Sequence, residues 1–411
     1  MNLAGWDTMS AAAMPLVNQG LAKAAASRDA AFSYTEGDLT VEGRFGPWRI
    51  LEGGSLQLLQ MSIPIESGTL TGLGPEPQTL DGLELIVEVV LRLLPNEAGD
   101  GVELTFSFER LTERGGPAVQ VLQVVDPSDR FPFIGNALVQ QALNAALNAN
   151  VAGVAHVLAT MPTRGSAAGW LTTPFTDWAN VRLGDGRQYL AIFGSLRKPD
   201  ARMALDKVDP RLFSGNGSAY FAASQTIFNQ KLMAPYLTKN FRPRTTFQVY
   251  GNGRKVRAKS FRMSSPRKEV ERLTVDSLGL APGSSKLSCA VRAVARLKAA
   301  NLHLELDMDM PFELKSGKIG FGADRNPRIK HRTAARKDVG VFKKTLGFAV
   351  TALVIEIARK SVYDMVRGIA TRMQNINAPA RMPASFIGIR DFEPSSAKLG
   401  TCFWFRDDRP V

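Results

Sequence analysis

The sequence has few of the residues that build metal centres, disulfide frameworks or histidine-based active sites. Its 411 residues include two cysteines and three histidines, and no C-x-x-C occurs. This argues against a disulfide framework and against structural zinc or iron–sulfur sites. The glycine-rich segments 215–217 and 251–253 lack nucleotide-binding spacing and are typical of hairpin turns, and no G-x-S-x-G occurs. We therefore predict no catalytic residue, no metal and no cofactor, so the protein is not expected to be an enzyme.

Long hydrophobic runs are also absent. Asn2, Asp7 and Asn18 interrupt the N-terminal segment, which has no basic region of the kind that opens a secretory signal. The most apolar window, 346–358, is short and contains Glu356, whereas a membrane-spanning helix needs about 20 apolar residues. We expect a chain that is cytoplasmic at synthesis, without a signal peptide or transmembrane segment. If it is released, lysis or a non-classical secretion route would be required.

Charge is divided unequally along the chain. Hydrophobic residues make up 45% and charged residues 22%, as in ordinary globular proteins, and the length predicts two or three domains. Residues 1–210 hold 15 Lys+Arg against 23 Asp+Glu, a net charge of −8, and residues 211–411 hold 36 against 15, a net of +21, which together give +13. We predict an acidic N-terminal region, 1–210, and a basic C-terminal region, 211–411. Such asymmetry favours a partner of opposite charge.

Two stretches carry most of the positive charge. Residues 239–272 hold eleven basic residues against Glu269 and Glu271, and residues 325–344 hold eight against Asp338. Lys255, Arg257 and Lys259 occupy alternate positions, which places them on one strand face with Arg254 and Arg262 across from them. Arg328, Lys330 and Arg332 also occupy alternate positions. Such a strip suits an anionic membrane or headgroup, where each basic residue contributes about 1 kcal/mol. The candidate residues for a lipid headgroup or anionic partner are Arg254, Lys255, Arg257, Lys259, Arg262, Arg328, Lys330 and Arg332.

Aromatic residues interleave the first basic stretch at Phe241, Phe247, Tyr250 and Phe261. A platform for single-stranded nucleic acid would require such residues, but no nucleic-acid-binding signature accompanies them. Aromatic residues at strand spacing are more often part of the core. Anionic lipid or an acidic protein is therefore favoured over nucleic acid. The alternative is that the basic stretches are solvated faces, or that they dock on the acidic half of another copy.

Hydrophobic periodicity predicts long antiparallel strands and few helices. Apolar residues occupy every second position at 83–93, 104–108 and 302–310, which indicates strands with one buried face. Asp307 and Asp309 lie on the polar face of the last run, so their spacing follows from the pleat and does not indicate a catalytic carboxylate pair. Helices are expected at 14–26, 134–148, 227–236 and 341–374.

The last of these helices would be about 50 Å long at 34 residues. Beside long one-sided strands, it favours a curled sheet wrapped lengthwise around the helix, a tube whose dry face could accept an acyl chain. The predicted fold class is accordingly α+β, elongated, with long helices wrapped by highly curved antiparallel sheets. The residues expected to line the tube are Leu85, Val87, Val89, Phe106, Phe108, Leu304, Leu306, Leu353 and Ile357.

Three segments resemble a known family. They are Gly5-Trp6-Asp7-Thr8 with Pro15-Leu16-Val17-Asn18, then 45–55 (FGPWRILEGGS), then the helix 134–148 followed by Asn150 and His156-Val157-Leu158-Ala159-Thr160. Their order and spacing resemble the 47-kilodalton protein family encoded beside OrfX-type clostridial neurotoxins. Leu158 stands where the family tends to have phenylalanine.

The resemblance implies the TULIP (tubular lipid-binding) superfamily, with a TULIP-like region in each half of the chain. It implies no catalytic residues, and it implies lipid or phosphoinositide binding together with an accessory role to secreted toxins, including insecticidal ones. We therefore expect a non-enzymatic protein that binds a lipid or an anionic membrane. The alternative is an interaction or scaffold module of a toxin complex, with a tube filled by side chains and a basic face that holds a toxin or a homologous accessory protein.

Overall fold

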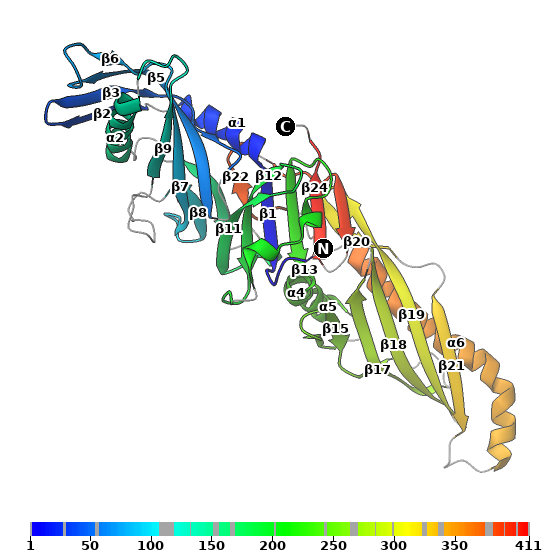
Figure 1. Ribbon diagram of the computed structural model, residues 1–411. Helices are drawn as coiled ribbons and strands as arrows, with labels where there is room; N and C mark the ends of the chain where they lie inside the picture. The colour runs from blue at the N-terminus through cyan, green and yellow to red at the C-terminus, as the bar shows by residue number, and fades with distance from the viewer. Residues whose placement is uncertain are drawn as a thin grey trace. The chain divides into compact units, whose positions relative to one another are not determined.

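The protein is described by a computed structural model (Figure 1). The residues that it describes are 2–27, 30–53, 57–106, 119–131, 133–150, 156–164, 169–200, 203–241, 245–263, 270–283, 285–297, 300–322, 327–335, 341–374, 381–389, 391–399 and 402–409.

The chain forms two compact units. The N-terminal unit comprises Ala4–Phe221, Met382–Phe392 and Asp407–Val411, and the C-terminal unit comprises Met1–Leu3, Ala222–Arg381 and Glu393–Arg406. The chain passes between units within β13 (Ala219–Ser224) and again within β24 (Cys402–Asp407). The predicted regions 1–210 and 211–411 were defined by their charge, whereas the two units are defined by contacts between residues. The predicted regions therefore stay a prediction.

The N-terminal unit is built on an antiparallel sheet in which β2, β3, β5, β7, β8, β10 and β22 are neighbours in that order, with β4 and β6 also paired to β5 and β9 paired to β7. The bounds are β2 Ala31–Glu36, β3 Leu39–Phe45, β4 Arg49–Ile50, β5 Leu58–Thr71, β6 Gln78–Thr79, β7 Glu84–Pro95, β8 Gly101–Phe106, β9 Val119–Val125, β10 Val157–Pro162 and β22 Ser385–Phe386.

The helix α2 (Phe133–Ala149) covers part of this sheet, contacting β9, β2 and β3. Its buried residues Val139, Leu143 and Leu147 repeat every four positions, as expected of a helix with one apolar stripe. They join the same core cluster as the alternate residues of β7. The predicted helix at 134–148 and the predicted strand at 83–93 are confirmed.

A second group of strands in the N-terminal unit pairs β1 (Thr8–Ala13) with β12 (Gln188–Ser195), and β12 with β11 (Phe175–Arg182). The helix α1 (Met14–Ala25) follows β1 directly, with a proline in its first turn, where no intrahelical N–H is required. It contacts β4, because the side chain of Asn18 donates to the Ile50 carbonyl at 3.0 Å and accepts from the Ile50 N–H at 2.8 Å.

The C-terminal unit has one large antiparallel sheet in the order β14-β15-β17-β18-β19-β20, with β16 paired to β17 and β21 paired to β19. The bounds are β14 Phe247–Tyr250, β15 Lys255–Ala258, β16 Phe261–Met263, β17 Val270–Pro282, β18 Lys286–Leu297, β19 Ala300–Lys315, β20 Lys318–Phe321 and β21 Arg328–Ala335. The unit also holds α4 (Gln225–Ile227), a π-helical turn (Phe228–Met233), α5 (Ala234–Asn240) and the hairpin of β23 (Ser396–Leu399) with β24.

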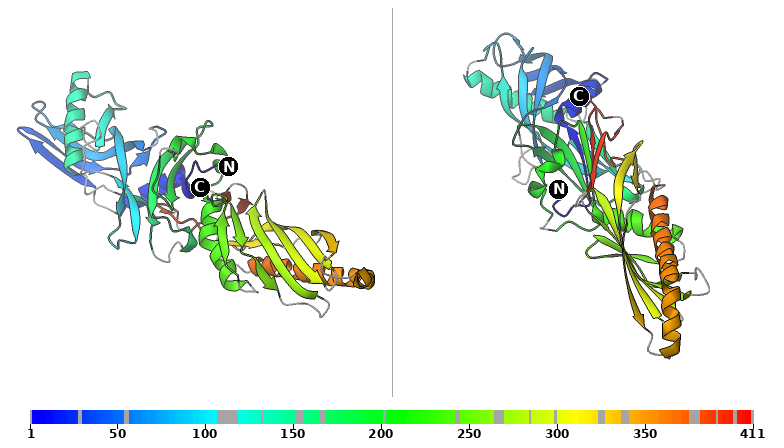
Figure 2. Two further views of the ribbon diagram at one scale, coloured as in Figure 1. Left: turned by 90° about the horizontal axis from the view of Figure 1, so that it is seen from below. Right: turned by 90° about the vertical axis from the view of Figure 1, so that its right-hand side faces the viewer.

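The helix α6 (Val341–Gln374) lies along a single face of this sheet and contacts β17 to β20 (Figure 2). Val362, Val366, Ile369 and Met373 are buried on its sheet side. A second stripe of α6 is exposed, formed by Lys360, Asp364, Arg367 and Thr371. The predicted helix at 341–374 is confirmed. Within the described part of the chain, no helix combines the length and the hydropathy needed to cross a membrane.

The predicted fold class, long helices wrapped by highly curved sheets, is wrong. Antiparallel strands dominate the described chain, and helices other than α6 have 17 residues or fewer. The exposed stripe on α6 shows that its sheet covers one side of it and does not enclose it. The physical reason is that alternating hydrophobicity requires a dry face on each strand, but it does not say how the sheet curves or what covers that face.

Candidate functional site

The first basic stretch forms a cluster on β15 and β16 of the C-terminal sheet, where β15 lies between the edge strand β14 and β17, and β16 pairs with β17. Val256 and Ala258 of β15 are buried, whereas the basic residues between and beside them are exposed, so the predicted one-faced arrangement is confirmed. We call the exposed set the β15 cluster: Arg254, Lys255, Arg257, Lys259 and Arg262. Among the described residues none of the five forms an ion pair. No aspartate or glutamate occurs between Asp209 and Glu269 in the sequence.

Pairing register places Lys255, Arg257 and Arg262 of the β15 cluster on the face of the sheet away from α6. Arg257 lies opposite Gly279 of β17, and Gly279 lies opposite Ala290 of β18, which is exposed. On β16, Arg262 lies opposite Thr274. A bulge in β17 gives it one extra residue, because Val275 and Ser277 pair with adjacent residues of β18. Arg262 and Arg257 therefore share the outer face although they belong to different strands.

The second basic stretch lies on β21, at the other edge of the same sheet. Arg328, Lys330 and Arg332, here called the β21 cluster, are exposed and also face away from α6. Arg328 lies directly opposite Asp307 of β19, and Lys330 lies opposite Glu305. Opposite charges at facing positions attract one another across the strands. The structure therefore places carboxylates beside the β21 cluster.

Two further cations engage the carboxylates of β19. Glu305 is 3.4 Å from Arg292, and Asp309 is 2.6 Å from Lys286. The hydrogen bond from Lys286, together with that from Ser288 and the charge of Arg328, lowers the pKa of the Asp309 carboxyl although partial burial opposes the shift. β19 thus carries carboxylates that lie beside basic residues of both neighbouring strands, β18 and β21.

The two clusters do not share a plane. Four strand steps separate β15 from β21, since β17, β18 and β19 lie between them. At about 4.8 Å per step the separation is about 19 Å. Adjacent strands rotate by about 20–25°, so the sheet turns by about 80–100° over this distance. A flat surface that touches the β15 cluster cannot lie flat on the β21 cluster.

A hollow of about 530 Å³ opens beside the β21 cluster. It is lined by His303, Glu305, Lys330, His331, Arg332 and Ala334. Both histidines are exposed, and the mixture of cations with Glu305 gives the hollow no single charge.

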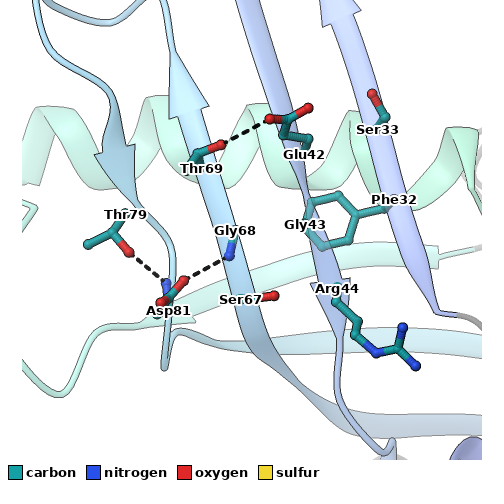
Figure 3. A pocket seen from close by; sticks show the side chains of 10 residues that line it. All are labelled: Phe32, Ser33, Glu42, Gly43, Arg44, Ser67, Gly68, Thr69, Thr79 and Asp81. Atoms are coloured by element: carbon teal, nitrogen blue, oxygen red, sulfur yellow. Dashed lines mark hydrogen bonds between the residues drawn. The ribbon is translucent and has the colours of Figure 1, made fainter.

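The N-terminal unit holds a second hollow, of about 590 Å³, which our sequence analysis did not predict (Figure 3). Its polar lining comes from β3, β5 and the segment after β6, and includes Glu42, Arg44, Thr69 and Asp81. The Gly68 N–H donates to Asp81 at 2.8 Å, and Thr69 donates to Glu42 at 3.5 Å. The carboxylates of Glu42 and Asp81 therefore each accept a hydrogen bond from within the lining.

Two glycines give this second hollow its floor. Gly43 lies opposite Gly68, and Phe32 of β2 lies opposite Gly43 with its ring stacked on Phe45 at 4.1 Å. A Cβ on Gly43 would lie 2.8 Å from the Phe32 ring, so the position requires glycine. The alternating polar residues of each strand are visible in the sequence, but the pairing of segments 25 residues apart is not.

Two aspartates and one cysteine of the C-terminal sheet have side chains of catalytic types. Asp307 and Asp309 lie on one polar strand face, as predicted. Burial raises the pKa of the Cys289 thiol to about 12, with a smaller contribution from Asp307, so this cysteine is not an activated nucleophile. No group of metal-ligating side chains occurs among the described residues.

The residues predicted to line a tube are mostly core residues of two separate units. Leu85, Val87, Val89 and Phe106 are buried in the N-terminal core. Leu304 and Leu306 are buried in the C-terminal unit, and Ile357 of α6 is half-buried. Phe108 and the side chain of Leu353 lie outside the described residues. A lipid contact at any of these residues stays a prediction.

Comparison with known proteins gives a family. The OrfX-like family model, described as "Protein OrfX2/OrfX3/P47", matches residues 3–295. The chain belongs to this family. No curated relative matches it. Among solved structures, it is similar to P47 from Clostridium botulinum A2, with 16% identity and a TM-score of 0.78 over 99% of this chain and 98% of that one. It is also similar to P47 of Clostridium botulinum E1, with 16% identity and a TM-score of 0.75 over the whole of both chains.

The aromatic and acidic residues in the segments that carry the OrfX-like resemblance make packing contacts and hydrogen bonds in the N-terminal unit. Trp6 is buried against Phe193, with ring centroids 5.6 Å apart, and Asp7 accepts from the Leu196 N–H at 2.9 Å. Trp48 packs edge-on against Phe106 at 5.3 Å. The family motifs therefore hold the N-terminal unit together, whereas the β15 cluster belongs to the C-terminal unit and to no motif.

Proposed function

We propose that this protein is a non-enzymatic accessory protein of a toxin gene cluster that docks on anionic membrane surfaces through the β15 cluster. Membership of the OrfX-like family supports the accessory role, because the 47-kilodalton proteins that the sequence resembles are encoded beside OrfX-type neurotoxins. The membrane contact is supported by the β15 cluster alone.

The observation that carries this proposal is the availability of the positive charge. Five exposed cations lie on or beside β15 and β16, and the residues opposite Arg257 and Arg262 on β17 are the neutral Gly279 and Thr274. An anionic surface would therefore meet cations that form no ion pair with any described residue. At about 1 kcal/mol for each basic residue near such a surface, three residues provide about a hundredfold preference.

The experiment compares two matched triple variants. Lys255→Glu/Arg257→Glu/Lys259→Glu reverses the β15 cluster, and Arg328→Glu/Lys330→Glu/Arg332→Glu reverses the β21 cluster. Flotation with neutral phosphatidylcholine vesicles, and with vesicles containing phosphatidylserine, measures binding of the full-length protein at about 0.1 M salt, where the Debye length is about 10 Å. Circular dichroism verifies that each variant is folded.

The wild-type protein should prefer the anionic vesicles, and the β15 variant should bind them at least about a hundredfold more weakly. The β21 variant should lose much less, because part of its positive charge is already offset by Glu305 and Asp307. Equal losses of affinity in the two variants would reject the assignment of membrane binding to the β15 cluster. A wild-type protein without preference for anionic vesicles would reject membrane docking altogether.

A further inference from the structure

Tyr250, the last residue of β14, is the most exposed large hydrophobic residue in the described chain, at 61%. The other exposed large hydrophobic residues all belong to the N-terminal unit and are at most 45% exposed. An apolar ring of this size in water is unfavourable unless a partner covers it.

The other three aromatic residues of this stretch are buried, so the expectation of a core role is correct for them and wrong for Tyr250. Phe241, Phe247 and Phe261 are 2%, 4% and 8% exposed. Phe241 packs edge-on against Phe247 at 5.2 Å and against Phe261 at 5.6 Å. These contacts fix the base of β14, whereas Tyr250 ends it in solvent.

Tyr250 lies on the same face of the sheet as the β15 cluster. It is paired directly with Lys255, and Gln248 is paired with Arg257, so the ring stands beside two exposed cations. An aromatic ring with a polar hydroxyl beside basic side chains suits the boundary between lipid headgroups and acyl chains. The phenolic group can stay hydrated there while the ring leaves water.

The turn that carries Tyr250 is held by two hydrogen bonds. Gly251, Asn252 and Gly253 all have positive φ, and the Arg254 N–H donates to the Gly251 carbonyl at 3.2 Å. The side chain of Asn229, which is fully buried, donates to the Gly253 carbonyl at 2.7 Å. The turn therefore pays little conformational entropy when it contacts a partner.

We propose that Tyr250 at the tip of the β14–β15 hairpin enters the headgroup layer of an anionic bilayer, while Arg254, Lys255 and Arg257 remain on the headgroups. This inference rests on the proposed function and adds a contact that charge alone does not provide. The partner is a lipid surface, because an extended acidic protein would pair with the cations without requiring an exposed ring.

Site-specific fluorescence tests the depth of Tyr250. Both native cysteines are buried, at 1% and 2% exposure, so a Tyr250→Cys thiol can be labelled selectively with an environment-sensitive NBD dye. Thr371→Cys, at an exposed position of α6, is the matched control. With phosphatidylserine-containing vesicles, the emission at position 250 should rise and shift to the blue, and nitroxide at the headgroup or upper acyl chain should quench it. The dye at position 371 should not respond.

Flotation of Tyr250→Ser separates this contact from electrostatic attraction. The variant should bind anionic vesicles roughly three- to tenfold more weakly, as expected if about half of the ring is buried on binding. Tyr250→Phe should retain the wild-type affinity. Because Tyr250 is exposed, neither change should affect folding.

Three other outcomes would contradict the inference. If the reversed β15 cluster abolishes binding while Tyr250→Ser binds like wild type and the dye at 250 is silent, the tip stays outside and the proposed function stands. If the wild type shows no preference for anionic vesicles, both fail. If soluble polyglutamate produces the same response at position 250, the tip binds an acidic chain and not a lipid surface.

Discussion

The two edges of the C-terminal sheet carry similar side chains in different surroundings. Both clusters alternate along a strand and face away from α6; β15 lies next to the edge strand β14, and β21 lies at the opposite edge. Opposite the β15 cluster lie Gly279 and Thr274, whereas opposite the β21 cluster lie Asp307 and Glu305. The difference shows that alternation places charge on a face, and that the neighbouring strand decides how much of it remains available to a partner.

Two hairpin turns of the C-terminal sheet, β14–β15 and β19–β20, differ in how tightly their glycines are packed, and this difference gives the largest expected effect. Gly253 in the β14–β15 turn has a φ of +86°, and a Cβ there would lie 2.6 Å from Cγ2 of Thr226. Gly317 in the β19–β20 turn has a φ of +66°, with no atom within 4 Å of such a Cβ. Gly253→Ala should lower stability by about 2 kcal/mol or more, because the left-handed conformation alone costs about 1–2 kcal/mol.

Gly317→Ala should show only the conformational part of that loss. In thermal denaturation followed by circular dichroism, the difference between the two variants should be a few degrees, since 1 kcal/mol corresponds to about 2–4 °C in a domain of this size. Equal shifts in Tm would mean that Thr226 does not restrain the β14–β15 turn.

A carboxylate opposite Arg257 should offset the charge of the β15 cluster, as Asp307 and Glu305 offset that of the β21 cluster. Gly279 has an ordinary φ, and a Cβ there would have only the Ala290 carbonyl within 4 Å, at 4.0 Å, so a side chain fits. Gly279→Asp should weaken binding to anionic vesicles about fivefold, equivalent to about 1 kcal/mol for one charge near the surface. The comparison is with Gly279→Asn, which adds nearly the same volume without charge. Identical affinities of the two variants would contradict our explanation of the difference between the edges.

The smallest effect concerns the ion pair that ties β19 to β18. Because its pKa is lowered in the folded protein, Asp309 stabilises the fold above the unfolded carboxyl value of about 3.9 and loses this contribution as the pH falls below it. Its partner Lys286 is 46% exposed, so the contribution should be less than about 1 kcal/mol. Asp309→Asn should lower Tm slightly at pH 7.

A double-mutant cycle with Lys286→Met isolates the pair itself. The coupling should be measurable at neutral pH and should vanish in acid. A coupling that is undiminished once the pH is low enough to protonate Asp309 in the folded protein would show that a contact other than the ion pair stabilises this position.

Much of the local structure could be predicted from the sequence. Helix α6 has the predicted bounds, and α2 differs by one residue at each end, because long periodic runs signal their type and extent strongly. The strand predicted at 302–310 lies within β19. The exposed positions of β15 were also correct, since they follow from the pleat.

The pairing of the strands, and the elements that pack on the buried face of each sheet, could not be predicted. Asp307 and Arg328 are 21 residues apart in the chain, and no local pattern indicates that they face one another. Tyr250 was expected in the core with its aromatic neighbours, but it stands at the end of an edge strand, a position that only the pairing of β14 reveals. The prediction of a tubular fold was wrong for a related reason. A strand pattern with one buried face is compatible with a helix that lies on the sheet as well as with a helix that a curled sheet encloses.

The bulge in β17 sets the phase of the charge pattern. Thr274 and Gly279 are five residues apart, an odd interval, and in an uninterrupted strand these two positions would face opposite sides of the sheet. The extra residue at Asp276 resets the alternation, so the strands that pair with the two halves of β17 present their cations to the same side. Deleting a single residue there would divide one patch of charge into two weaker patches, without removing any charged side chain from β15 or β16.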